Sequence, residues 1–328
     1  MMGENNSYNN LQEQEVLEVN REGGRRAYVY GIPILIILIS LIGIVMVYTE
    51  KEKNGVVISD VPQKDSFANP FESLQITAKA AYVIDAKTQR VLFSQNEEYQ
   101  LPLASLTKLI TALVAIETLN VADAISIDPK AIEAEGDSGL FANEYWRVGD
   151  LISFTLISSS NDGASALASV VSAQTSIVDS GGIVAVMNAK VAEIGLSQTY
   201  FINETGLDES INFSGAYGSA RDMAHLFEYI LRRHPSIIES TRYDKELFIS
   251  LDNFEHEAVN TNEVVYAIPG FLGGKTGFTD LAGGNLVIAF DAGLNHPIII
   301  SVLGGTKEGR FTDIEALAAA ARTYIREK

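Results

Sequence analysis

Short apolar runs separated by polar turns occur near both ends of the chain and predict strands there. In the C-terminal part, residues 286–290 and 297–303 are rich in β-branched side chains and flank the polar segment 291–295. Continuous apolar runs of this length are typical of strands that are buried on both faces. Nearer the N-terminus, residues 81–85 and 90–93 flank a four-residue turn. The pattern therefore predicts a β-hairpin at each place.

Helical spacing dominates the region between these strands. From Leu106, apolar residues recur at i, i+3, i+4, i+7 and i+8, which predicts a helix with a buried face. Ser219 and Asp222 form a capping-box pattern before an amphipathic run. Further helices are predicted at residues 151–157, 223–231 and 313–326. Strands at both ends with helices between them predict an α+β fold, in which distant segments close one antiparallel sheet.

The N-terminal region has a different composition. Residues 1–26 are polar and rich in Asn and Glu, which predicts a disordered segment. An uncharged stretch from Ala27 to Tyr48 follows; as a helix it would span about 33 Å, enough to cross a membrane. We therefore expect a transmembrane anchor at residues 27–49, a polar linker at residues 50–78 and a folded catalytic domain at residues 79–328.

The orientation of this anchor follows from the flanking charges. Arg21, Arg25 and Arg26 directly precede the apolar stretch, whereas Lys51 and Lys53 are offset by glutamates. Cationic flanks stay on the cytoplasmic side, so the sequence predicts a single-pass protein of the cell membrane with its catalytic domain outside the cytoplasm. A cleaved signal peptide is the alternative, but no small-residue cleavage site follows the stretch.

Composition excludes several classes of chemistry. The 328-residue chain has no cysteine, which rules out disulfides, thiolate zinc sites and cysteine nucleophiles. Its four histidines lack metal-binding spacing, so we expect no metal site and no cofactor, and we expect these histidines on the surface or on helix faces. The formal net charge of −18 argues against a nucleic-acid partner, because the chain offers few cations to neutralise phosphates.

Three short motifs follow one another along the chain and indicate serine acyl transfer. They are Ser105-Leu106-Thr107-Lys108, Ser159-Ser160-Asn161 and Lys275-Thr276-Gly277. Ser105 and Lys108 are three positions apart on the predicted helix, so their side chains share one face. A lysine with its reference pKa of about 10.4 is a poor base near neutral pH, but burial or a nearby cation would lower that pKa. Lys108 is therefore the candidate base and Ser105 the candidate nucleophile.

The order of these motifs resembles that of the penicillin-recognising serine enzymes. The flanks Pro102-Leu103-Ala104 before Ser105 and Phe278-Thr279 after Gly277 resemble their serine-type D-alanyl-D-alanine carboxypeptidase branch. The resemblance extends from about residue 79 to the C-terminus. It implies a β-lactamase/transpeptidase-like fold, with an antiparallel sheet flanked by helices and a helical subdomain.

The resemblance also implies a role for each motif residue. Ser159 would relay a proton toward the leaving group, and Asn161 would hold the peptide amide of the substrate. Lys275 and Thr276 would bind a substrate carboxylate, and Gly277 would let the backbone approach the ligand closely. The oxyanion hole would consist of the backbone N–H groups of Ser105 and Phe278.

The implied activity is removal of the terminal D-Ala from peptidoglycan stem pentapeptides through a Ser105 acyl-enzyme, with β-lactam antibiotics as covalent inhibitors. One alternative is a β-lactamase, but the chain between Asn161 and Lys275 contains Glu193 and Glu204 without the E-x-x-L-N element of class A enzymes. Another alternative is a penicillin-sensing or substrate-binding module that is acylated and does not turn over. The sensing module would retain the same acylation residues, so turnover of a D-Ala-D-Ala peptide would distinguish the carboxypeptidase from it.

Overall fold

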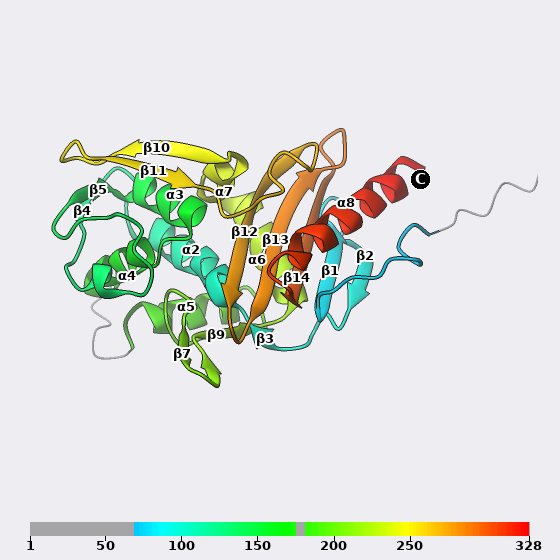
Figure 1. Ribbon diagram of the computed structural model, residues 1–328, viewed down its shortest axis with the longest axis horizontal. Helices are drawn as coiled ribbons and strands as arrows, with labels where there is room; N and C mark the ends of the chain where they lie inside the picture. The colour runs from blue at the N-terminus through cyan, green and yellow to red at the C-terminus, as the bar shows by residue number, and fades with distance from the viewer. Residues whose placement is uncertain (1–68, 175–180, 328) are drawn as a thin grey trace, which may run out of the picture. The chain divides into compact units, whose positions relative to one another are not determined.

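The central element of the protein is a five-stranded antiparallel sheet. A computed structural model describes residues 69–174 and 181–327 (Figure 1). The strand order is β12-β13-β14-β1-β2, so N-terminal and C-terminal segments pair in one sheet. The strands are β1 (Ala80–Asp85), β2 (Arg90–Gln95), β12 (Phe271–Thr279), β13 (Gly283–Asp291) and β14 (Pro297–Gly305). This arrangement confirms the predicted α+β class and both predicted hairpins.

Helices cover both faces of this sheet, because its inner strands are apolar on both sides. Along β14, Ile298, Ile300 and Val302 belong to the cluster that contains α8 (Gly309–Glu327). Ile299 and Leu303 belong to the cluster that contains α6 (Ala220–Arg233). Alternate side chains of a strand point to opposite faces, so the β-branched run fills two cores. Complete burial of each such side chain contributes roughly 1.5–3 kcal/mol.

A helical region packs beside β12 and surrounds α2 (Lys108–Thr118). Every residue of α2 from Lys108 to Ala115 is buried, as expected of a helix enclosed on all sides. It contacts α3 (Val148–Ser158), α4 (Asn161–Gln174) and α5 (Gly182–Glu193), as Figure 1 shows. The 3₁₀ turn η1 (Ala104–Thr107) leads into α2 and contacts β12. This junction brings the sheet edge next to the buried helix.

Short strands and turns complete the described part. The ribbon β10 (Lys245–Ile249)–β11 (Glu255–Val259) packs near α3, and β3 (Leu101–Pro102), β9 (Ala216–Gly218) and β6 (Tyr200–Phe201) form a small sheet. The remaining strands are the pairs β4 (Ala124–Ser126)–β5 (Tyr145–Arg147) and β7 (Asp208–Ser210)–β8 (Phe213–Ser214). The short helical segments are η2 (Ala131–Glu133), α7 (Ser236–Glu239) and η4 (Ser240–Arg242).

Two sequence expectations about helices are confirmed in detail. The hydroxyl of Ser219 caps α6 by accepting a hydrogen bond from the Asp222 N–H at 3.1 Å. The predicted helix at residues 313–326 is present within α8. The expectation that all histidines lie on the surface or on helix faces is wrong for His256. This residue is buried in β11, where its Nε2 lies 2.6 Å from Oε1 of Glu144, a partner 112 positions earlier.

The folded body includes residues that the sequence placed in the linker. Phe71 is buried and its ring lies 5.7 Å from that of Phe93. The Asp313 carboxylate accepts hydrogen bonds from the Thr77 and Ala78 N–H groups and from the Thr77 hydroxyl, at 2.8–3.1 Å. The hydrogen bonds to Asp313 extend the folded body toward the N-terminus, because Asp313 lies in α8, more than 230 positions after Thr77 and Ala78.

The predicted disordered segment and transmembrane anchor lie outside the described residues. Within residues 69–174 and 181–327, no helix combines the length and hydropathy needed to cross a membrane.

We expect Asp313→Ala to lower the free energy of unfolding by about 2–3 kcal/mol, because it leaves buried N–H groups without their charged acceptor. Urea unfolding can be followed through the fluorescence of Trp146, the only tryptophan. Glu315→Ala, an exposed change on the same helix, is the control and should shift the midpoint little. Equal midpoints for the two variants would contradict the anchoring role of Asp313.

Candidate active site

The candidate nucleophile lies on a constrained turn. Ser105 is partly exposed in η1, and Ala104 before it has a φ of 49°, in the left-handed region that non-glycine residues rarely occupy. The Thr107 hydroxyl donates to the Ala104 carbonyl oxygen at 2.8 Å and stabilises the turn. A Cβ at Gly206, whose own φ is +80°, would overlap that same oxygen. The surrounding structure thus holds Ser105 in a conformation that is unfavourable in isolation.

Lys108 is the most heavily bonded member of the site. Its Nζ lies 2.9 Å from the Ser105 Oγ, 2.6 Å from the Asn161 Oδ1 and 2.9 Å from the Thr205 carbonyl oxygen. An ammonium has three protons to donate, and these neutral oxygens can accept all of them. The side chain is completely buried and forms no hydrogen bond or ion pair with a described carboxylate.

This environment disfavours the charged form of Lys108. Burial lowers the pKa of Lys108 from its usual 10.5 to about 7, and the nearby Glu204 carboxylate partly opposes this shift. A substantial fraction of neutral amine is therefore present near neutral pH. The amine can then accept the Ser105 proton across the 2.9 Å contact.

Ser159 and Asn161 come from the junction between α3 and α4. Ser159 ends α3 with a φ of 61°, and this left-handed conformation turns the chain into α4. Its Oγ accepts a hydrogen bond from the Lys275 Nζ at 2.8 Å. The adjacent serines have other partners, since Ser158 donates to the Phe154 carbonyl oxygen and the Ser160 Oγ accepts from the Gly163 N–H. Among the three serines, the structure therefore places Ser159 beside the second lysine.

The third motif lies within β12 and not at its start. The preceding pair Gly273-Gly274 resembles a turn in sequence, but β12 begins at Phe271 and passes through this pair with an irregular register. A Cβ at Gly273 would lie 2.9 Å from the Ile238 carbonyl oxygen and the Thr241 hydroxyl. Gly273 therefore permits close packing of the strand against α7 and η4.

β12 places the motif side chains at different depths. Lys275 and Thr276 are buried, and the Thr276 hydroxyl lies 2.5 Å from that of Thr261. A Cβ at Gly277 would lie 2.7 Å from the Leu103 carbonyl oxygen, so glycine allows β12 to approach the Ser105 turn. Phe278 is 42% exposed, and the Lys307 Nζ lies 5.4 Å from the centre of its ring.

The charged form of Lys275 is also disfavoured in the absence of a ligand. Its Nζ donates to Ser159 Oγ and to the Thr276 carbonyl oxygen, which are both neutral. Burial lowers the pKa of Lys275 well below its usual value, and repulsion from Lys108 and Arg310 lowers it further. An anionic group bound here would favour the charged form, so this end of the site is suited to a carboxylate.

Sequence reasoning missed several residues that complete the site. Arg310, buried in α8, donates from Nη1 to the Gly277 carbonyl oxygen at 2.8 Å. The Asn285 side chain donates to the carbonyl oxygens of Pro102 and Leu103 and so ties the Ser105 turn to β13. Thr205 supplies a backbone acceptor to Lys108, a contact that does not depend on side-chain identity. No local pattern marks these residues, because each acts across a long sequence separation.

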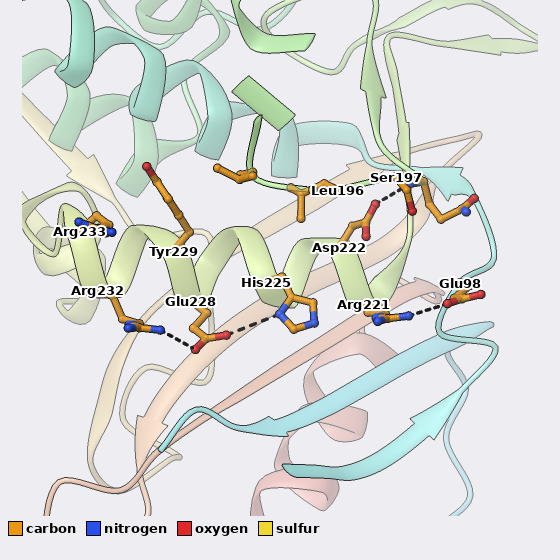
Figure 2. A pocket seen from close by; sticks show the side chains of 13 residues that line it. Glu98, Leu196, Ser197, Arg221, Asp222, His225, Glu228, Tyr229, Arg232 and Arg233 are labelled. Atoms are coloured by element: carbon orange, nitrogen blue, oxygen red, sulfur yellow. Dashed lines mark hydrogen bonds and ion pairs between the residues drawn. The ribbon is translucent and has the colours of Figure 1, made fainter. Parts of the chain in front are cut away.

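No three His, Cys, Asp or Glu side chains in the described part of the chain are grouped so that they could hold an ion. A separate cavity of about 420 Å³ lies along α6 and contains none of the motif residues (Figure 2). Two arginines on α6 pair with glutamates there, Arg221 with Glu98 at 2.6 Å and Arg232 with Glu228 at 3.6 Å. The three motifs therefore meet outside this cavity, around Ser105 and Lys275.

Comparisons with known proteins agree with the chemistry of the site. A family model described as D-alanyl-D-alanine carboxypeptidase matches residues 65–307. The D-alanyl-D-alanine carboxypeptidase DacB2 of Mycobacterium tuberculosis is 31% identical over 236 residues, which cover 71% of this chain and 77% of that protein. A D-alanyl-D-alanine endopeptidase of Escherichia coli is 29% identical over 271 residues, which cover 80% of this chain and 81% of that protein.

A solved structure shows the same fold. The crystal structure of penicillin-binding protein D2 from Listeria monocytogenes, in its ampicillin-bound form, matches with a TM-score of 0.63 and 28% sequence identity. The match covers 75% of this chain and 98% of that chain.

We expect the Lys108 amine to titrate with a midpoint near pH 7, seen in the ¹⁵N shift of its Nζ in lysine-labelled protein. Glu204→Gln should move this midpoint to lower pH, because it removes the negative charge that favours the ammonium. Glu133→Gln is the matched control, since Glu133 is exposed and its side chain makes no hydrogen bond or ion pair with the described residues. A wild-type midpoint near 10.5, or an unchanged midpoint in Glu204→Gln, would contradict this electrostatic account.

Proposed function

The chain belongs to the D-alanyl-D-alanine carboxypeptidase family, and we propose that Ser105 catalyses removal of the terminal D-Ala from peptidoglycan stem pentapeptides. The observation that carries this proposal is the pairing of Ser105 with a completely buried lysine. The two side-chain atoms lie 2.9 Å apart, and burial lowers the pKa of Lys108 to about 7. The pair can therefore generate a serine nucleophile without histidine.

In the first step, neutral Lys108 accepts the hydroxyl proton while the Ser105 Oγ forms a bond to the carbonyl carbon of the penultimate D-Ala. The N–H groups of Ser105 and Phe278 stabilise the oxyanion. The C–N bond then breaks, and the amine of the terminal D-Ala departs with the proton that Lys108 accepted, which reaches it through Ser159. In the second step, water attacks the ester, releases the shortened peptide and restores Ser105.

Substrate binding uses the partly exposed amide of Asn161 and the cationic end of the site. Asn161 already accepts from Lys108 and donates to the Glu135 carbonyl oxygen, so its orientation is fixed before the peptide binds. The substrate carboxylate is held by Lys275 and Thr276, with Arg310 adding positive charge from beneath β12. β-Lactams carry a carboxylate next to a reactive amide, and we propose that they acylate Ser105 as covalent inhibitors.

We further propose that the protein is a single-pass protein of the cell membrane with its catalytic domain outside the cytoplasm. The uncharged stretch at residues 27–48 and the preceding arginines support this topology. Residues 50–68 would then connect the anchor to the folded body.

We expect Ser105→Ala to abolish both release of D-Ala from a pentapeptide ending in D-Ala-D-Ala and covalent labelling by penicillin. D-Ala release by the detergent-solubilised full chain and mass mapping of the penicillin adduct measure the two effects. Ser160→Ala is the neighbouring control and should retain labelling, because its hydroxyl bonds within α4 and to Ser138. An adduct on another serine would reject the assignment.

The same measurement separates the alternatives. An acylated wild-type protein that releases no D-Ala would be a penicillin-sensing or binding module. A protein that hydrolyses penicillin rapidly and leaves the peptide intact would be a β-lactamase.

We expect Thr276→Val to lower kcat/KM for the free-acid peptide roughly ten- to hundredfold, the effect of losing one charge-assisted hydrogen bond of about 1.5–3 kcal/mol. A C-terminally amidated peptide has no carboxylate, so the variant should barely change its already slow turnover. Steady-state kinetics on both peptides test the assignment. Equal losses on the two peptides would show that Thr276 maintains β12 or its contact with Thr261 and does not recognise a carboxylate.

A further inference from the structure

A cationic and apolar surface lies at the end of the sheet where β13 turns into β14 (Figure 1). A cavity of about 630 Å³ is lined there by the β1–β2 turn, the β13–β14 turn and the last turns of α8. We call this surface the turn patch and define it by its charged and apolar members, Lys87, Leu294, His296, Arg322, Ile325 and Arg326.

The charge of the turn patch is opposite to that of the chain. Its lining contains two arginines, a lysine and a histidine but no carboxylate, in a protein with a formal net charge of −18. Lys87 and Arg326 are exposed, and neither side chain forms an ion pair or hydrogen bond with the described residues. Two nearby acidic groups are already engaged: Asp85 binds the His296 Nε2 at 2.7 Å, and Asp291 accepts N–H groups of its own turn. Glu327, which follows Arg326, is exposed outside the cavity lining.

An apolar residue protrudes beside these cations. Leu294 is 96% exposed at the tip of the β13–β14 turn, with a φ of 55° that turns the chain there. Cations next to a protruding apolar side chain complement a surface that is anionic outside and apolar beneath. An anionic phospholipid leaflet has this chemistry.

The chain also enters the folded body next to the turn patch. Phe71, near the first described residue, has its ring 6.2 Å from that of Tyr324, which lies between Thr323 and Ile325 of the cavity wall. If the proposed anchor ends at residue 49, 19 residues separate it from the first described residue. A segment of 19 residues can span at most about 65 Å when fully extended. The turn patch would therefore be within reach of the lipid surface.

We propose that the turn patch docks on the anionic headgroups of the membrane and that Leu294 inserts among them. This proposal rests on the proposed membrane anchor and adds a second contact, which orients the catalytic domain on its tether. Tethering raises the effective concentration of lipid at the patch, so even a weak contact is populated. The attraction between cations and headgroups should weaken as salt screens it.

The absence of cysteine makes a site-specific test direct. Full-length Leu294→Cys carries a polarity-sensitive NBD label and is reconstituted into vesicles of phosphatidylglycerol and phosphatidylcholine. Ile211→Cys is the matched control, because Ile211 is an apolar residue with 87% exposure at the turn between β7 and β8, at the opposite side of the view in Figure 1. Nitroxide-labelled lipids should quench the label at position 294 and leave the label at position 211 unaffected.

Charge reversal separates headgroup attraction from simple proximity. Adding Lys87→Glu and Arg326→Glu to the position-294 probe should reduce the docked population about tenfold or more at low salt. Hydrolysis of a soluble peptide should stay unchanged, since neither residue contacts the Ser105 site. Pure phosphatidylcholine vesicles should give the same loss of quenching as the charge reversal.

Vesicle flotation distinguishes failure of the docking proposal from failure of the anchor. A chain that floats with the vesicles but shows equal quenching at positions 294 and 211 overturns the docking proposal and leaves the anchor intact. Quenching at position 294 that is equal in phosphatidylcholine and phosphatidylglycerol also overturns it, because no headgroup charge is then required. A chain that does not float with either vesicle overturns both proposals.

Discussion

The structure of the site depends on one buried amine. The Lys108 Nζ joins the Ser105 turn, the start of α4 through Asn161 and the segment that contains Thr205. Because burial lowers the pKa of Lys108 from 10.5 to about 7, the folded state binds fewer protons than the unfolded state between these values. Stability therefore increases as pH rises through this interval, and below pH 7 the buried ammonium costs roughly 5 kcal/mol relative to high pH. This cost arises because α2, which carries Lys108, is enclosed on all sides.

Burial also disfavours the charged form of Lys275, the second buried lysine of the site. Lys108 and the buried guanidinium of Arg310 disfavour the charged form of Lys275, and all three side chains make their described hydrogen bonds to neutral oxygens. The site is thus short of negative charge until a ligand supplies it. A substrate with a terminal carboxylate relieves this repulsion at the Lys275 end, while Lys108 can remain neutral and accept the serine proton. The two lysines can therefore differ in protonation state although both are buried.

The sequence predicted the elements of this fold better than their boundaries and contacts. Apolar periodicity located α2, α6, α8 and the two hairpins, because each depends mainly on its own local pattern. It did not place Gly273-Gly274 within β12, since a glycine pair that permits close packing cannot be distinguished locally from a turn. It also misjudged His256, whose burial depends on Glu144, 112 positions away. The motifs identified Ser105, Lys108, Ser159 and Lys275, but the partners supplied by Asn285, Arg310 and the Thr205 backbone required the tertiary structure.

Backbone strain links these contacts to the geometry of the nucleophile. Ala104 and Ser159 both occupy the left-handed region, and such conformations cost on the order of 1–3 kcal/mol each unless the surroundings impose them. Around Ala104, the restraints are the close approach of Gly206, the proximity of Gly277 to the Leu103 carbonyl oxygen and the hydrogen bonds from Asn285. These contacts come from three separate parts of the chain. The position of Ser105 relative to Lys108 is consequently a property of the whole folded body, which explains why a four-residue motif alone is insufficient to make the site.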